Sequence, residues 1–391
     1  MTHLLRVRAA LTKCKILVAD DVLTNRQLIV HSLRKVGFTR ILTAADGEQA
    51  LELTRAEAPD FLLLDLLMPN LDGFEVCATL RREAQFVDLP ILSMTALENP
   101  EERARAFAAG ATDMILKPIH HAELIARTTT HLERRLLIRG LREFHDRTAA
   151  ELAMAREMQQ ALLPEACTVR HIHERYGVSA AALFMPSTEL GGDIWGIWPI
   201  DAARFGIYAL DFSGHGTIAA INTFRLHTLL AHKEFDRSQP GTFLASVNDR
   251  LSCLLSPEHF ATMVYATIDI DRNVLTYAAA GAPAMVIASP DATLLSLDGS
   301  GVPLGIQGGV VYPQRDVPFG PGARLLLHSD ALPEARRLDG TLLGEGTAHT
   351  MAAAALRCGS AAEVVADLAS RLAAVAGRQL DDDLTLVCLM R

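Results

Sequence analysis

The chain has 391 residues, of which half are hydrophobic and 21% are charged, and its formal net charge at pH 7 is −9. This composition excludes wholesale disorder, and the acidic balance argues against a protein that binds nucleic acid through its phosphates. At about 150 residues per domain, the length predicts two or three domains. The six cysteines are too far apart for a zinc site or a disulfide framework, so we expect reduced thiols, most of them buried.

The first segment of the sequence carries no signal for export. Its apolar stretch, in MTHLLRVRAALTKCKILVADD, is broken by arginines and lacks a cleavage site. No segment approaches the ~18 apolar residues that a membrane span requires. We therefore expect a cytoplasmic protein without a membrane partner.

Short apolar segments alternate with amphipathic segments over the first 120 residues. Strands made wholly of apolar residues, such as FLLL, are typical of a parallel sheet that is covered on both faces. Their alternation with helices predicts a doubly wound α/β domain. The expected strands are 15–19, 41–43, 61–64, 91–94 and 114–116, and the expected helices are 25–36, 48–56, 74–83 and 101–109.

A long helix is predicted after residue 121, where the chain has no proline before Pro164. Apolar or small residues recur every three or four positions from Leu137 to Leu162, and charged residues fill the remaining faces. So narrow an apolar stripe is typical of a two-stranded coiled coil, which predicts a homodimer joined through this helix. The alternative is a single helix that packs on its own domain.

The chain becomes rich in expected strands after Pro164. Runs of strands with grouped helices predict an α+β layered domain of about 225 residues. The expected strands are 205–209, 262–268, 274–278, 284–287, 324–327 and 384–389, and the expected helices are 217–231, 240–255 and 361–376.

Polar side chains stand at the ends of strands in the N-terminal domain. Asp20 and Asp21 follow the first expected strand, Asp65 follows the third, Thr95 the fourth and Lys117 the fifth. Because the carboxyl ends of parallel strands meet at one edge of a sheet, we expect these side chains to lie together. Carboxylate and carbonyl oxygens suit Mg²⁺, and a carboxylate can also act as the nucleophile that accepts a phosphoryl group.

Together with the runs DLLMPNLDG, SMTA and LKP, these residues resemble the receiver domain of two-component response regulators over roughly residues 13–135. The resemblance implies that a sensor histidine kinase phosphorylates Asp65 and that Thr95 and Lys117 contact the phosphate. The implied ligands of a receiver Mg²⁺ are Asp21, Asp65 and the carbonyl oxygen of Leu67, with Asp20 nearby or acting through water. Met114 departs from the pattern, since the family usually has an aromatic residue there.

Aspartates recur in the C-terminal domain, in the runs ELGGDIWG, ALDFSGHG, LHSDA and DDDLTL. Carboxylates from separate strands, without histidine or cysteine partners, favour hard cations such as Mn²⁺ or Mg²⁺. Two such ions about 4 Å apart can activate a water molecule for phosphoryl displacement. Any one of these runs taken alone is more simply read as a turn aspartate.

The combination resembles the stress-response and sporulation branch of the PPM family, the metal-dependent protein phosphatases of type 2C, over residues 155–391. The runs AREMQQALLP, FATM and GVPLG belong to the same resemblance, which implies two bound Mn²⁺ or Mg²⁺ ions bridged by Asp211. The other implied ligands are Asp193, the carbonyl oxygen of Phe212, Asp330 and Asp382, with Asp383 as a further candidate. His215 is a weaker candidate for a catalytic acid. Gly196 and Ala331 stand where the family usually has aspartate and glycine.

The sequence therefore predicts a multidomain α/β protein. Its expected parts are an N-terminal extension (1–12), a doubly wound (βα)5 receiver (13–128), a helical coiled-coil linker (129–164) and an α+β PPM phosphatase domain (165–391) made of a β-sandwich flanked by helices. The expected function is a response regulator whose output is a metal-dependent serine/threonine protein phosphatase. The resemblance implies a phosphorylated STAS-domain anti-anti-sigma protein as its substrate in a partner-switching pathway.

Two other functions are compatible with parts of the sequence. A catalytically weak or inactive PPM domain would act as a phosphorylation-gated binding module. A DNA-binding or cyclic-nucleotide output domain is disfavoured, because no helix-turn-helix pattern or basic patch follows residue 165. We expect no nucleic-acid partner.

Overall fold

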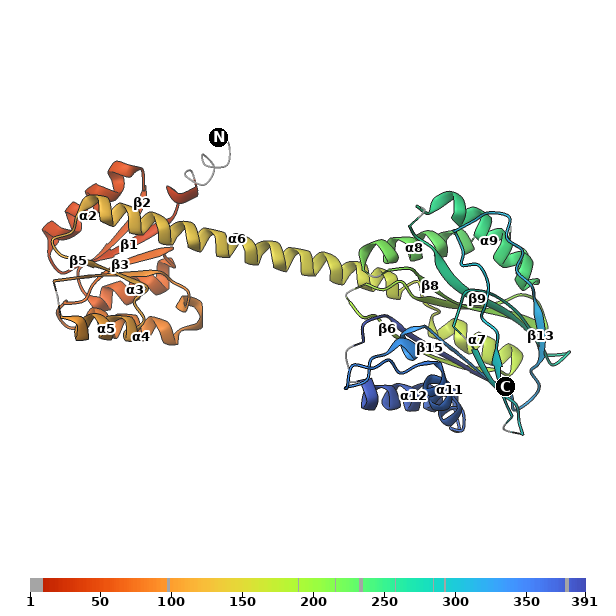
Figure 1. The fold of residues 1–391 in the computed structure, drawn as a ribbon. Helices are drawn as coiled ribbons and strands as arrows, with labels where there is room; N and C mark the ends of the chain where they lie inside the picture. The colour runs from red at the N-terminus through yellow and green to blue at the C-terminus, as the bar shows by residue number, and fades with distance from the viewer. Residues whose placement is uncertain are drawn as a thin grey trace. The chain divides into compact units, whose positions relative to one another are not determined.

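The computed structural model describes residues 10–391 except 97–98, 189, 215, 232–234, 257, 284, 292 and 377–379. His215, the weaker catalytic candidate, therefore lies outside the described residues, as does Glu189 of the ELGGDIWG run. The chain divides into two compact units, the first ending at Thr148 and the second beginning at Ala149. Figure 1 labels the elements of both.

The first unit is built on a five-stranded parallel sheet with the strand order β2-β1-β3-β4-β5 (Figure 1). Its strands are β1 (Lys15–Ala19), β2 (Arg40–Ala44), β3 (Phe61–Asp65), β4 (Ile91–Thr95) and β5 (Asp113–Leu116). The helices are α2 (Leu23–Val36), α3 (Gly47–Glu57), α4 (Gly73–Arg82) and α5 (Pro100–Ala109), with a short 3₁₀ turn at Ala84–Phe86. The predicted doubly wound fold is confirmed, and the expected boundaries shift by no more than two residues.

Alternation along the buried strands divides the interior of this unit into two hydrophobic clusters. Leu17 and Leu62 belong to one cluster, while their neighbours Ile16 and Phe61 belong to the other. Strand side chains point alternately to the two faces, so each cluster is covered by its own layer of helices. Both faces are closed in this way, and the polar strand ends are left at the edge of the sheet.

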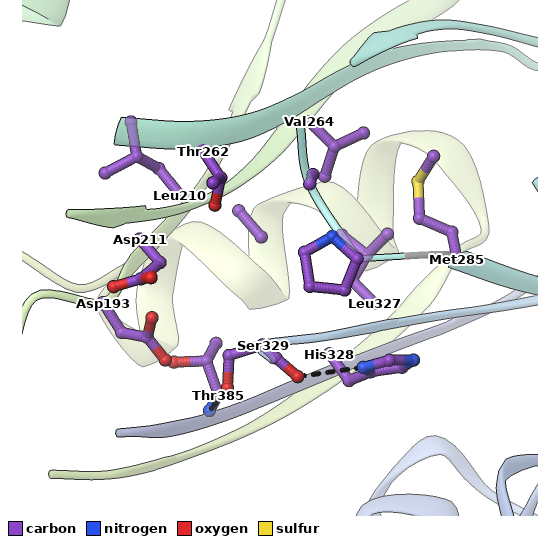
Figure 2. Close-up of a pocket in the computed structure, with 13 residues that line it drawn as sticks. Asp193, Leu210, Asp211, Thr262, Val264, Met285, Leu327, His328, Ser329 and Thr385 are labelled. Atoms are coloured by element: carbon purple, nitrogen blue, oxygen red, sulfur yellow. Dashed lines mark hydrogen bonds between the residues drawn. The ribbon is translucent and has the colours of Figure 1, made fainter. Parts of the chain in front are cut away.

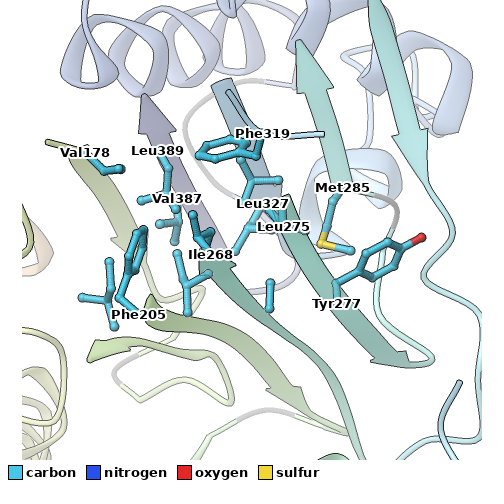
Figure 3. Packing of buried hydrophobic residues seen from close by; sticks show 14 of the residues in the cluster. Val178, Phe205, Ile268, Leu275, Tyr277, Met285, Phe319, Leu327, Val387 and Leu389 are labelled. Carbon is cyan, nitrogen blue, oxygen red and sulfur yellow. The ribbon is translucent and has the colours of Figure 1, made fainter. Parts of the chain in front are cut away.

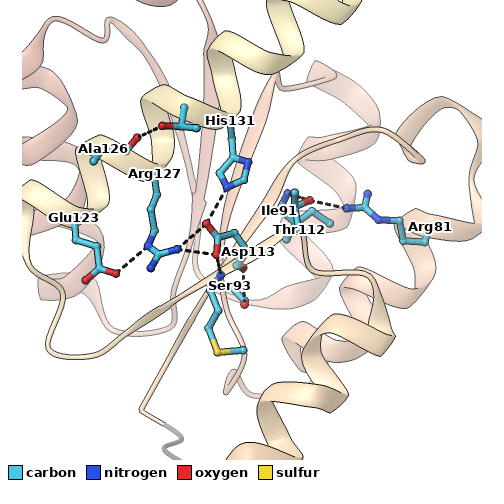
Figure 4. Close-up of polar contacts among 11 residues, drawn as sticks. Arg81, Ile91, Ser93, Thr112, Asp113, Glu123, Ala126, Arg127 and His131 are labelled. Carbon is cyan, nitrogen blue, oxygen red and sulfur yellow. Dashed lines mark hydrogen bonds and ion pairs between the residues drawn. The ribbon is translucent and has the colours of Figure 1, made fainter.

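Helix α6 (His121–Gln160) is one continuous helix of 40 residues, as predicted. Asp113, at the start of β5, anchors its first turns in the first unit (Figure 4). The Asp113 carboxylate accepts two hydrogen bonds of 2.8 Å from Arg127 Nη1 and lies 2.9 Å from His131 Nε2. Glu123 holds the same arginine from one helical turn earlier, at 2.8 Å from its Nε.

Beyond these anchors, α6 carries the exposed part of the predicted apolar stripe. Leu137, Leu141 and Phe144 are 69%, 69% and 68% exposed. Large apolar side chains are rarely left so open in consecutive helical turns unless another surface covers them. The last residue of the predicted stripe is not exposed in this way. Leu162 lies just beyond the end of α6 and packs, partly buried, against a core of the second unit.

The second unit contains two five-stranded antiparallel sheets, ordered β13-β10-β9-β8-β7 and β12-β11-β14-β15-β6 (Figure 1). The first sheet comprises β7 (Ile194–Pro199), β8 (Arg204–Phe212), β9 (Ala261–Asp269), β10 (Val274–Ala280) and β13 (Arg315–Pro318). The second comprises β6 (Ser179–Met185), β11 (Met285–Ala288), β12 (Leu294–Leu297), β14 (Arg324–His328) and β15 (Leu384–Met390). The helices are α7 (Ala166–Tyr176), α8 (Thr217–Ala231), α9 (Pro240–Leu254), α10 (Ala331–Glu334), α11 (Glu345–Ala355) and α12 (Ala361–Ala376). No helix among the described residues combines the length and the apolarity needed to cross a bilayer.

Three hydrophobic cores stack the layers of this unit. The central core lies between the two sheets, where Phe205 and Ile268 of the first sheet meet Leu327 and Val387 of the second (Figure 3). A second core packs α8 and α9 on the first sheet, and a third packs α11 and α12 on the second. This is the predicted β-sandwich flanked by helices.

The expectation that most thiols are buried is only half met. The buried thiols are Cys14, Cys77 and Cys388, the exposed ones are Cys167 and Cys253, and Cys358 is intermediate. Cys167 and Cys253 lie on helices α7 and α9, each of which buries only one face against the sheets. All six are free, as the spacing predicted.

Candidate functional site

Three carboxylates meet at the carboxyl edge of the parallel sheet, as predicted. Asp20 and Asp21 follow β1, Asp65 is the last residue of β3, and one oxygen of each lies within 4.8 Å of the other two. Asp20 and Asp65 are buried, whereas Asp21 is exposed. Asn25 on α2, which the sequence analysis missed because it belongs to no motif, donates from Nδ2 to Asp20 Oδ1 at 3.2 Å. Three oxygen donors at this spacing fit a hard divalent cation such as Mg²⁺.

Lys117 brings a positive charge to this cluster from the residue after β5. Its Nζ donates to Asp20 Oδ2 at 2.8 Å and to Asp65 Oδ2 at 2.5 Å. Burial acts to lower the pKa of Lys117, but the hydrogen bonds to the two aspartates outweigh it and the pKa is raised. Burial also raises the pKa of Asp65, and Lys117 opposes that effect. The cation therefore stays charged beside the carboxylate that is expected to accept phosphate.

The other predicted receiver residues lie around the same edge. Thr95 is the last residue of β4 and is buried, and its carbonyl oxygen accepts the backbone N–H of Lys117 at 2.7 Å. The backbone N–H of Leu67 donates to Asp65 Oδ1 at 3.2 Å. Met114 is buried in β5, so an apolar side chain fills this position of the sheet.

In the second unit, two aspartates lie side by side where the first sheet ends (Figure 2). Asp193 directly precedes β7, Asp211 is the penultimate residue of β8, and the register of the two strands makes them cross-strand neighbours. Both line a small cavity between the two sheets (Figure 2). The polar residues that share this cavity are Thr262, His328, Ser329 and Thr385.

The Asp193 carboxylate is buried without enough hydrogen-bond donors. Asp193 is only 2% exposed, and its Oδ2 atom has no hydrogen-bond partner among the described residues. Burial, followed by the charge of Asp211, raises its pKa well above the ordinary value. Gly192 leaves the approach open, since a Cβ there would stand 2.8 Å from the Phe212 carbonyl oxygen. An orphaned carboxylate oxygen beside a second carboxylate and a carbonyl fits a bound cation.

Asp330 and Asp382 add negative charge from the second sheet. Asp330 lies two residues after β14, and Asp382 lies two residues before β15. Burial, with the charges of Asp330 and Asp382, raises the pKa of Asp211 to about 8, and burial with the charge of Asp382 raises that of Asp330 to about 6. No described lysine or arginine forms an ion pair with Asp211 or Asp330. Several aspartate carboxyl groups therefore gather here without a basic side chain to neutralise them.

The spacing in this second cluster differs from that of the first. Among the described residues, only Asp20, Asp21 and Asp65 bring three acidic oxygens within 4.8 Å of one another. The aspartates of the second unit are therefore spread over a wider volume than one ion occupies. That spread is compatible with the predicted pair of ions, which share ligands across about 4 Å.

Asp383 is held differently from its neighbour Asp382. It is 1% exposed, and its Oδ1 accepts hydrogen bonds from the backbone N–H and the hydroxyl of Ser187 at 2.7 and 3.1 Å. Its Oδ2 accepts the N–H of Gly192 at 2.5 Å. Both oxygens thus order the loop that leads into Asp193.

Gln159 is a residue of the site that the sequence analysis did not identify. It lies in the last turn of α6, is 3% exposed, and its Nε2 donates to the carbonyl oxygen of Gly191 at 2.6 Å and to Thr223 Oγ1 at 3.2 Å. Its Oε1 accepts the N–H of the same glycine at 3.2 Å. The end of α6 is therefore bonded to the loop that carries Asp193. The run AREMQQALLP contained this residue, but its role depends on a partner that only the fold reveals.

Comparison with known families and proteins divides the chain in the same way. Residues 16–129 match the family model of the response regulator receiver domain, and residues 201–391 match that of stage II sporulation protein E. The solved SiaA-PP2C domain of Pseudomonas aeruginosa is 21% identical and has a TM-score of 0.55. That comparison covers 64% of this chain and 98% of the other, and it bears on the fold alone.

Curated relatives are similar to about a third of the chain. The probable transcriptional regulator ycf27 of Cyanophora paradoxa is 40% identical over 124 residues, which cover 32% of this chain and 50% of the relative. The response regulator MprA of Mycobacterium ulcerans is 41% identical over 140 residues, which cover 36% and 56%. The chain spans about half the length of the curated relatives it matches.

Proposed function

We propose that this chain, which belongs to the response regulators through residues 16–129 and to the SpoIIE-type PPM phosphatases through residues 201–391, is a phosphorylation-regulated serine/threonine protein phosphatase. The observation that carries the proposal is the pair Asp193–Asp211, in which a buried carboxylate oxygen without a donor adjoins a carboxylate of raised pKa. Such a pair is stabilised by bound cations, and cations held by oxygen ligands supply the chemistry of phosphoester hydrolysis.

In the first unit, Asp65 is the proposed phosphoacceptor. One of its oxygens would attack the phosphorus atom while the bond to the donor's phosphohistidine nitrogen breaks. Lys117, which is paired with Asp65 before the reaction, would then pair with a phosphoryl oxygen, and Thr95 would contact another. A bound Mg²⁺ would neutralise charge on the phosphoryl group. The residues proposed to hold it are Asp20, Asp21, Asp65 and, through its carbonyl, Leu67.

In the second unit, the aspartates from both sheets are the proposed metal ligands. Two bound Mn²⁺ or Mg²⁺ ions would supply an activated water and a clamp on the phosphate oxygens. Asp211 is proposed as the shared ligand, because it adjoins Asp193 on the first sheet and because, after burial, the charges of Asp330 and Asp382 from the second sheet raise its pKa. Asp383 is proposed as a positioning residue, since both of its oxygens are used in hydrogen bonds. The other proposed ligands are Asp193, the Phe212 carbonyl, Asp330 and Asp382.

The proposed partners follow from the two families. A sensor histidine kinase would phosphorylate the receiver, and a phosphorylated STAS-domain anti-anti-sigma protein would be the substrate. A second copy of the chain would pair through α6, where Leu137, Leu141 and Phe144 stand exposed. We propose a cytoplasmic site of action, where the first unit would meet the kinase and the second unit its substrate.

The decisive test is the release of phosphate from a phosphorylated STAS protein in the presence of Mn²⁺, with and without beryllofluoride to mimic the phosphorylated receiver. We expect metal-dependent release at a rate that beryllofluoride changes. A chain that binds the phosphoprotein yet hydrolyses neither it nor p-nitrophenyl phosphate would instead be the gated binding module.

Insertions in the middle of α6 test the proposed coupling through a helical pair. An α-helix turns about 100° per residue, so two residues inserted after Arg147 would rotate the following stripe by about 200°, onto a charged face. Seven residues would return it to within about 20° of its original direction. We expect the shorter insertion to abolish the response to beryllofluoride and the longer one to keep much of it, with basal hydrolysis measurable in both. Light scattering reports the molecular mass in parallel, and equal regulation in the two variants would reject the model.

Gln159→Ala tests whether α6 supports the metal site. The substitution leaves the N–H and the carbonyl of Gly191 without their side-chain partner, and the loop that carries Asp193 loses its connection to the helix. We expect kcat for p-nitrophenyl phosphate to fall about tenfold or more and the half-saturating Mn²⁺ concentration to rise. Gln160→Ala is the matched control, because its side chain is exposed one position further along. Equal kinetics in the two variants would contradict the assignment.

A further inference from the structure

A cavity of about 390 Å³ lies in the second unit, beside the C-terminal end of α6. Residues 161–165 form one wall, and Trp198 on β7, Tyr208 on β8 and the last turns of α8 form the others. Its volume is at the lower end of the range for small-molecule sites. None of the proposed metal ligands lines it, so it is separate from the metal cluster.

The floor of the cavity is made of aromatic rings that lie against glycines of the neighbouring strand. In the β7–β8 register, Gly196 pairs with Tyr208 and Gly206 pairs with Trp198. A Cβ at position 196 would stand 2.2 Å from the Tyr208 ring, and a Cβ at position 206 would stand 2.8 Å from Trp198 Nε1. Both glycines are therefore needed to admit the rings. This accounts for Gly196, which replaces the aspartate that the family usually has.

Tyr208 places a polar group in this aromatic floor. The residue is 2% exposed and lines the cavity, and its ring centroid lies 5.0 Å from that of Trp198. Burial raises the pKa of Tyr208 above its ordinary value, so the hydroxyl keeps its proton at neutral pH and can act as a donor. A tyrosine hydroxyl in the lining of a cavity can donate a hydrogen bond to a ligand bound there.

Arg237 supplies a fixed positive charge at the same place. Its guanidinium lies over the Trp198 ring, 4.4 Å from the centroid, and donates one hydrogen bond to the Leu230 carbonyl at 2.5 Å. No carboxylate of a described residue pairs with it, and among the described residues that line the cavity it is the only lysine or arginine. Burial lowers the pKa of His227, so the imidazole in the wall adds no charge at neutral pH. Glu165 stands exposed at the rim, where it accepts the thiol of Cys167 at 3.1 Å.

We propose that this cavity binds a planar aromatic or heteroaromatic acid. The ring would lie beside Trp198, the acid group would pair with Arg237, and the Tyr208 hydroxyl would donate to the same acid group. The occupant would touch residues 161–165 and β7 at once. Because β7 begins immediately after Asp193, a bound acid would stiffen the connection between the end of α6 and the metal loop and so change the phosphatase rate.

Binding of 1-naphthoate to the full chain tests the site, measured by saturation-transfer NMR and calorimetry. We expect saturable one-to-one binding with a Kd at or below about 1 mM. Arg237→Gln should weaken it at least about fivefold and Tyr208→Phe about threefold, since the first removes the charge and the second only the donor. The neutral analogue 1-naphthalenemethanol should bind more weakly and should not distinguish wild type from Arg237→Gln. Arg225→Gln, an exposed arginine of α8 outside the cavity, is the matched control.

Absence of saturable binding up to about 5 mM, or equal affinities for wild type and Arg237→Gln, would overturn the proposal. The initial rate of p-nitrophenyl phosphate hydrolysis with Mn²⁺ tests the coupling to the metal loop. We expect saturating 1-naphthoate to change that rate at least about twofold in wild type and not in Arg237→Gln. An unchanged rate at saturation would overturn the coupling. The binding measurements need no hydrolysis, so their failure is distinguishable from failure of the proposed phosphatase activity.

Discussion

Replacing Asp211 with asparagine is expected to lower phosphatase turnover by at least about a hundredfold, a loss of roughly 2.7 kcal/mol of transition-state stabilisation. The physical reason is the loss of the carboxylate proposed to be shared by both metal ions. EDTA should produce a similar loss in the wild type, and added Mn²⁺ should restore only the wild type. Turnover of p-nitrophenyl phosphate at saturating substrate is the measurement.

The same substitution should stabilise the metal-free protein. The pKa of Asp211 is about 8 in the folded chain, against an ordinary value of 3.8. Between these values the folded state holds a proton that the unfolded state has released, so the free energy of unfolding falls as pH rises from about 4 to about 8. Asparagine does not titrate, and we expect the variant in EDTA at pH 8 to gain about 1 kcal/mol or more, seen as a higher Tm.

Asp381→Asn is the matched control for both measurements. Asp381 adjoins the same acidic run but is exposed, and it pairs with Arg336 at the surface. It should change neither turnover nor Tm appreciably. Metal-independent hydrolysis by the wild type, or full activity of Asp211→Asn, would reject the two-metal proposal.

Asp65→Asn is expected to remove labelling by acetyl phosphate, with at least about a hundredfold less acyl phosphate than the wild type. An amide is a poor nucleophile, and both oxygens of Asp20 are already used, Oδ1 by Asn25 and the backbone N–H of Val22 and Oδ2 by Lys117. Intact-mass spectrometry measures the adduct. The phosphatase response to beryllofluoride should disappear with it.

Two comparisons make this experiment specific. Asp88→Asn alters an exposed aspartate of the same unit, which pairs with Arg142, and should label normally. Circular dichroism should show the same fold for both variants. Persistent labelling of Asp65→Asn, at a site mapped elsewhere in the first unit, would show that another residue is the acceptor.

The first unit was predictable because its sequence signals are local. Most strands are short apolar runs, and helices α3, α4 and α5 begin at capping residues, such as Asp46, whose carboxylate accepts a backbone N–H at 2.8 Å. In a parallel sheet, moreover, the carboxyl ends of all strands lie at the same edge, whatever the order of the strands. The association of Asp20, Asp21 and Asp65 therefore followed from order along the chain.

The second unit was less predictable because its strands and its contacts lack such signals. β6 (SAAALFM) is rich in alanine, which favours helices, and β7 (IWGIWP) contains glycine and ends in proline. The function of Gln159 depends on a bond to Gly191, which is distant in sequence. The different environments of Asp382 and Asp383 depend likewise on how the loops fold together.

The pairing of β6 with β15 also determines when the second unit can complete its fold. Ser179 and Met390 are partners in that ladder, although they are roughly 200 positions apart. During synthesis, the first unit can fold once its own residues have emerged from the ribosome. The β-sandwich of the second unit cannot be completed until β15, which is synthesised much later, is available to pair with β6. Asp382 and Asp383 adjoin that strand, so the acidic cluster assembles last. A growing chain thus completes the fold of its first unit well before the acidic cluster of its second unit forms.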